Sequence, residues 1–152
     1  MPVFYDSFYE QISEMHADIE KALNGVGSET LDWTPGLEMN SLAVLVVHLV
    51  GAERYWIGVA LNEPPNRDRE TEFRTQGLSA GDLRALIVSA DTYARQALDR
   101  LSLLDLEAMR LSPRNGKEFT TGWCLIHALQ HTALHCGHIQ LTRQLWEQRG
   151  RS

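Results

Sequence analysis

Residues 119–142 read FTTGWCLIHALQHTALHCGHIQLT, and this stretch decides the fold class. It contains no Asp, Glu, Lys or Arg, but its four histidines and two glutamines make it too polar for a lipid bilayer. An uncharged segment of this length and polarity predicts a helix that is buried in protein. We expect that helix to start after an N-cap at Thr120 or Thr121 and to end near Gln148.

Three further segments show the apolar spacing of amphipathic helices, and no convincing strand alternation separates them. The second of these is capped by Asn40 or Ser41, and the third opens with a capping box from Ser79 to Asp82. The four predicted helices cover residues 4–23, 41–61, 79–101 and 121–148. The pattern is typical of helices that pack around one core.

Length gives the domain organisation. A chain of 152 residues has the usual size of one domain, so we predict a single all-α domain over residues 1–152 that forms a four-helix bundle. The connector at residues 62–78 is long enough to run the height of such a bundle. The two helices that it joins could therefore lie parallel.

Charge and cysteine usage restrict partners and location. The net charge is −6 and the pI is about 5.5, which is the wrong sign for binding phosphate backbones. Residues 1–6 lack the basic and apolar segments of a secretory signal. Cys124 and Cys136 would lie about 18 Å apart along one helix, too far for a disulfide, and reduced thiols fit the cytoplasm. We expect a cytoplasmic protein that binds neither nucleic acid nor a membrane.

Four of the six histidines occur on one face of the last helix. At about 100° per residue, His127, His131, His135 and His138 fall within an arc of about 80°. His131 and His135 have the i, i+4 spacing that lets two imidazoles bind one ion. Thr132 stands where an H-E-x-x-H motif has its glutamate, which excludes a zincin. The inward glutamates of a di-iron bundle are also missing.

A mononuclear site needs a third ligand, and His48 is the candidate because apolar residues of the second helix enclose it. Three imidazoles leave coordination positions open, which is typical of catalytic metal sites. The alternative is that these histidines only hydrogen-bond to one another and to the backbone. We expect His127 and His138 to line the site, and His16 and Glu53 to face solvent or, for Glu53, a partner chain. His138 and Tyr55 are the weak candidates for moving a proton, and no carboxylate can be assigned as a base.

Two segments carry a resemblance to a known family. Residues 40–56, NSLAVLVVHLVGAERYW, and residues 127–139, HALQHTALHCGHI, resemble the second and fourth helices of the DinB/YfiT-like proteins. The resemblance implies an up-down-down-up four-helix bundle, often a homodimer, with a divalent ion such as zinc or nickel on His48, His131 and His135. His138 is a departure, because many relatives have glutamine there.

The resemblance also implies candidate functions. Characterised relatives include transferases that use low-molecular-weight thiols and a thiol-dependent isomerase, so a metal-dependent thiol S-transferase or isomerase with a small-molecule substrate is the favoured expectation. A metal-dependent hydrolase is the second. A non-catalytic, stress-associated protein that binds a metal or a small ligand is the third. If a metal binds, we expect its release on acidification near pH 6.5, where unperturbed histidines gain a proton.

Overall fold

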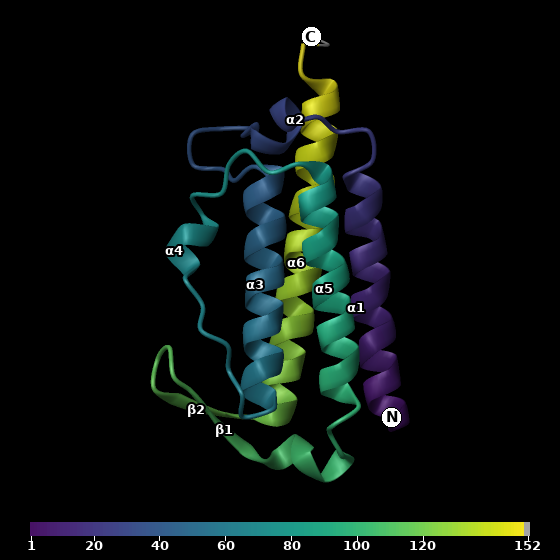
Figure 1. Ribbon diagram of the computed structural model, residues 1–152, viewed down its shortest axis with the longest axis vertical. Coiled ribbons are helices and arrows are strands. Elements are labelled where there is room, and N and C mark those ends of the chain that lie inside the picture. The colour runs from purple at the N-terminus through teal and green to yellow at the C-terminus, as the bar shows by residue number, and fades with distance from the viewer. Residues whose placement is uncertain (151–152) are drawn as a thin grey trace.

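The computed structural model describes residues 1–150 and confirms the four predicted helices (Figure 1). They are α1 (Val3–Ala22), α3 (Leu42–Ala60), α5 (Ala80–Leu98) and α6 (Thr121–Gln148). The predicted caps are present at three of them. The Ser41 hydroxyl accepts from the Val44 N–H at 3.2 Å, and the Thr120 hydroxyl accepts from the Trp123 N–H at 3.1 Å. Ser79 and Asp82 form the expected capping box. Local sequence therefore fixes where these helices begin.

The helices run up, down, down and up, so α3 and α5 are parallel (Figure 1). Each of the four packs against two neighbours in the ring α1–α5–α3–α6. The connector between the parallel helices climbs along the outside of the bundle beside α3 and carries the short helix α4 (Arg69–Glu72) (Figure 1). This crossover confirms the topology expected from the long connector.

Helix α3 is the most buried of the four. Its length and its mean hydropathy of 1.5 would be enough for a helix to cross a membrane. The uncharged residues 119–142 do not reach these values. However, 83% of this stretch is buried by the rest of the protein. Burial of this extent is that of a core helix. The helix supplies one side of the candidate site described below.

Four short elements were not predicted: α2 (Ser28–Asp32), α4, the 3₁₀ helix η1 (Leu103–Glu107) and a hairpin. The hairpin pairs β1 (Met109–Ser112) with β2 (Lys117–Thr120) in antiparallel register. In β1 the polar side chains face the protein, which hides the usual strand pattern. Arg110 Nε donates to the Ala60 carbonyl at 3.0 Å, and Ser112 is buried against Tyr55. Apolar Met109 and Leu111 are exposed instead.

A polar network crosses the core and corrects two expectations. His16 and Glu53, expected at the surface, are 3% and 1% exposed. His16 Nε2 lies 3.0 Å from Glu53 Oε2, and its Nδ1 lies 3.2 Å from Asp91 Oδ1. The Thr132 hydroxyl also donates to Glu53 at 3.0 Å. Burial alone would lower the pKa of His16, but the hydrogen bonds and charges of Glu53 and Asp91 outweigh it and raise that pKa.

Candidate metal centre

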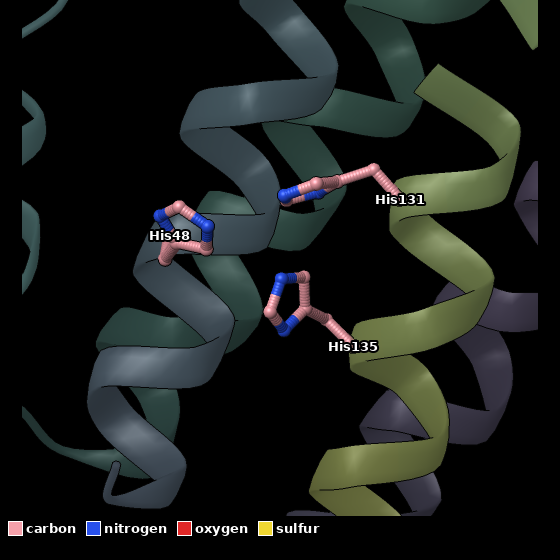
Figure 2. Close-up of side chains that lie close together, drawn as sticks. All are labelled: His48, His131 and His135. Carbon is pink, nitrogen blue, oxygen red and sulfur yellow. The ribbon is translucent and has the colours of Figure 1, made fainter. Parts of the chain in front are cut away.

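The three predicted ligands converge between α3 and α6. His48 projects from α3, and His131 and His135 project from successive turns of α6 toward it (Figure 2). One ring nitrogen from each residue can be chosen so that all three lie within 4.8 Å of one another. The ring centroids are 5.0 Å apart for His48 and His131, and 4.4 Å apart for His131 and His135. The two histidines at i, i+4 on α6 and the enclosed histidine on α3 therefore form one cluster.

The electrostatics of this cluster suit a cation. Burial is the main cause that lowers the pKa of His131 to about 3, and neighbouring His135 and His48 add to it. Burial, together with the nearby His48 and His138, lowers the pKa of His135 to about 4. Both imidazoles are therefore neutral near pH 7 and have lone pairs to offer. The Nδ1 atom of His131 is buried and has no hydrogen-bond partner among residues 1–150. Two neutral imidazoles, one with an unsatisfied nitrogen, next to a third histidine fit a divalent transition metal.

A carboxylate that the sequence analysis did not identify orients the third imidazole. Glu72 Oε2 lies 2.9 Å from His48 Nδ1. Burial would raise the pKa of Glu72, but hydrogen bonds with His48 and Arg67 outweigh it and keep the group ionised. An ionised carboxylate can only accept, so His48 Nδ1 donates to it and Nε2 is the nitrogen that can bind a metal. This is the carboxylate–histidine arrangement that supports metal ligands.

Arg67 and Gly51 hold this carboxylate in place. Arg67 donates to both oxygens of Glu72, at 2.6 and 2.7 Å, and its own side chain is 6% exposed. Gly51 lies on α3 one turn after His48, where a Cβ atom would collide with the Glu72 carboxylate. The glycine thus makes room for the hydrogen-bonded pair. A glycine inside an otherwise bulky apolar helix is the signal in the sequence that could have pointed to a close approach.

A cavity of about 210 Å³ adjoins the cluster. Two cluster members, His48 and His131, form part of its wall. The remaining wall residues are Ala52, Trp56, Arg67, Arg69, Arg114 and His127. His127 stacks on Trp123 with ring centroids 4.8 Å apart, so it lines the cavity as expected. Small molecules can therefore reach the histidines from this side.

The two candidates for moving a proton lie in different surroundings. Tyr55 is 3% exposed, and its hydroxyl lies 2.8 Å from Ser112 Oγ and accepts from the Arg114 N–H at 3.2 Å. It thus contacts the hairpin. His138 Nδ1 lies 3.4 Å from His135 Nδ1, and His138 borders a separate apolar hollow of about 160 Å³. His138 is therefore the candidate that touches the cluster.

Comparisons with known proteins agree on the fold. A conserved protein from Enterococcus faecalis superposes with a TM-score of 0.79 at 16% identity, over 95% of this chain and 97% of that one. YfiT from Bacillus subtilis, described as a probable metal-dependent hydrolase with an unusual four-helix bundle topology, gives 0.77 at 15%, over 95% and 88%. These identities support the fold alone.

An enzyme structure is also similar. A variant of mycothiol-dependent maleylpyruvate isomerase superposes with a TM-score of 0.66 at 14% identity, over 90% of this chain and 60% of that one. Comparison with curated protein sequences gave no match. The family model of the DinB superfamily matches residues 11–139, which is most of the chain. The predicted family is thereby confirmed: this chain belongs to the DinB superfamily.

Proposed function

We propose that this protein is a metal-dependent enzyme that activates a low-molecular-weight thiol for S-transfer or isomerisation. One observation carries the proposal: His48, His131 and His135 each place a nitrogen within 4.8 Å of the others, and the first two of them line a cavity. A divalent ion held there, such as zinc or nickel, would lower the pKa of a thiol or a water molecule that reaches it. The open cavity supports an enzyme over a closed, purely structural metal site.

The carboxylates around the cluster favour a thiol over water. The only carboxylate within hydrogen-bond distance of the three histidines in residues 1–150 is Glu72, and both of its oxygens are engaged by His48 or Arg67. No carboxylate lines the described part of the cavity. A free thiol has a pKa of about 8.5, whereas that of water is about 15.7, so a thiol needs far less help from a base.

A metal-dependent hydrolase is the second candidate, and the structural similarity to YfiT favours it. His138 would then be the group that moves a proton, because it touches His135. The two candidates differ in the co-substrate that they require. Turnover of an ester or amide without any thiol would support the hydrolase.

The test is a screen of low-molecular-weight thiols against small electrophiles, with protein loaded with zinc or nickel. We expect turnover that requires both the thiol and the ion and that is lost in His48→Ala. His127→Ala, which changes a cavity histidine outside the triad, should still bind one ion per chain. Absence of any metal-dependent turnover, with the ion bound stoichiometrically, would favour a non-catalytic binding protein. The homodimer that the resemblance implies stays a prediction, which the mass of the protein in solution tests.

A further inference from the structure

The cavity beside the histidines has a strongly cationic wall. Three of its lining residues are arginines, Arg67, Arg69 and Arg114, and the described part of the lining includes no carboxylate. This is unusual in a protein whose net charge is −6. The arginines come from two different segments, the crossover connector and the hairpin turn. Chain segments far apart in the sequence thus place their guanidinium groups around one space.

The three arginines are not equivalent. Arg67 is neutralised, because both oxygens of Glu72 accept from it. Arg69 and Arg114 are exposed and form no ion pair with any of residues 1–150. The cavity therefore has two guanidinium groups whose charge the rest of the chain does not compensate. Guanidinium groups match the geometry of carboxylate and phosphate oxygens and can bind them with two parallel hydrogen bonds.

Both uncompensated arginines are tethered next to the cavity. The guanidinium of Arg69 lies over the ring of Phe73, 4.7 Å from its centroid, and that ring lies 4.6 Å from the ring of His48. The backbone N–H of Arg114 donates to the hydroxyl of buried Tyr55 at 3.2 Å. The Phe73 ring holds the face of the Arg69 guanidinium and leaves its N–H groups at the edge free to donate, whereas Arg114 is held at its backbone. A site prepared in this way loses less conformational entropy when an anion binds.

We propose that Arg69 and Arg114 form an anion subsite that binds the carboxylate or phosphate group of a small substrate. That substrate would then extend from the two arginines toward the histidine cluster, two members of which line the same cavity. The direction of the reacting end rests on the function proposed above. Anion binding itself depends only on the arginines and needs no metal.

Equilibrium binding of succinate and of inorganic phosphate tests the subsite, first in protein stripped with a chelator. We expect at least one of the two anions to bind, and the double variant Arg69→Gln/Arg114→Gln to weaken it by about tenfold or more, as loss of charge-assisted hydrogen bonds predicts. Which anion binds more tightly distinguishes a carboxylate substrate from a phosphate substrate. Succinamide, the uncharged analogue of succinate, should not bind.

Arg74→Gln is the matched control, because Arg74 is an exposed arginine close to Arg69 in sequence and does not line the cavity. It should bind the anion as the wild type does. Equal affinity of the double variant and the wild type, or no binding of either anion, would overturn the subsite. Repeating the titration with zinc bound separates the two proposals: arginine-dependent binding without metal would stand even if the histidines hold no ion.

Discussion

The carboxylate of Glu72 and the imidazole of His48 form a hydrogen-bonded pair, with 2.9 Å between Oε2 and Nδ1. The two residues come from different elements, the end of α4 and the middle of α3. The pair orients the His48 ring and leaves Nε2 as the nitrogen that can bind a metal. Groups that orient a metal ligand in this way commonly change metal affinity when they are replaced.

Glu72→Gln should weaken zinc binding by about 10–100-fold, because the variant loses the negative charge that orients and polarises His48. Competition with a chelator of known affinity measures this change. Glu70→Gln is the control, since Glu70 is an exposed neighbour that pairs with Arg74 at the surface. Unchanged affinity in Glu72→Gln would show that the carboxylate does not support a ligand.

Gly51→Ala should weaken zinc binding by a similar factor without changing any ligand. The new Cβ would displace the Glu72 carboxylate, which Arg67 and His48 hold on its other sides. The matched control is Gly137→Ala, because nothing lies within 4 Å of a Cβ at that position on α6. Combining Gly51→Ala with Glu72→Gln should add little to either change alone. Wild-type affinity in Gly51→Ala would contradict the close contact.

The imidazoles of His131 and His135 should stay neutral at pH 5 in the metal-free protein. Their pKa values of about 3 and about 4 lie below the usual 6.5, so protons compete with a metal at these two ligands only in more acidic solution. At these two ligands, protonation is therefore expected at a lower pH than the release near pH 6.5 that the sequence suggested. Nitrogen-15 NMR of the histidine side chains measures their protonation directly. Protonated rings at pH 5 would contradict the structure.

The same two shifts give the sign of the stability change. A histidine with a depressed pKa in the folded state binds fewer protons than in the unfolded chain. The metal-free protein should therefore lose stability as the pH falls from about 6.5 toward 4. Bound zinc should raise stability across this range and leave the loss in place, because these imidazoles carry no proton in the folded state with or without the ion. Urea midpoints with and without zinc across this range provide the measurement.

His16 should affect stability in the opposite direction. Its pKa is raised by Glu53 and Asp91, so its contribution is complete below about pH 6.5 and is lost as the pH rises through the raised pKa. His16→Gln should cost about 3–5 kcal/mol at pH 6, because it leaves Glu53 buried without its partner. The cost should shrink by pH 9. A cost that does not depend on pH would mean that folding leaves the pKa of His16 unchanged.

Helix ends and metal candidates were predictable because local rules determine them. Caps at Ser41, Ser79 and Thr120 set the starts of three helices, and the i, i+4 spacing of His131 and His135 places both on one face. Only convergence with His48 required the tertiary structure, and the enclosed position of His48 pointed to it. A short-range pattern and a burial argument were therefore enough for the histidine cluster.

The role of Glu72 could not be predicted from the sequence, because this residue lies in a connector whose path depends on how the helices pack. Nothing periodic in residues 62–78 says which side chain points inward. His16 is different, because a signal was present. Phe8, Ile12, His16 and Ile19 follow one another at spacings of four, four and three, so His16 lies on the apolar stripe. A histidine on that stripe could have been matched with an acidic residue on a neighbouring helix.

The crossover beside α3 has a consequence for how this fold diversifies. The same segment that permits two parallel neighbours also delivers Arg67, Arg69, Glu72 and Phe73 to the site. If the proposed metal centre and anion subsite are correct, exchanging residues 62–78 between homologues would change metal affinity and anion binding together, while the packed interior of the bundle stayed intact. One connector therefore sets the topology of the bundle and also supplies side chains next to the histidines.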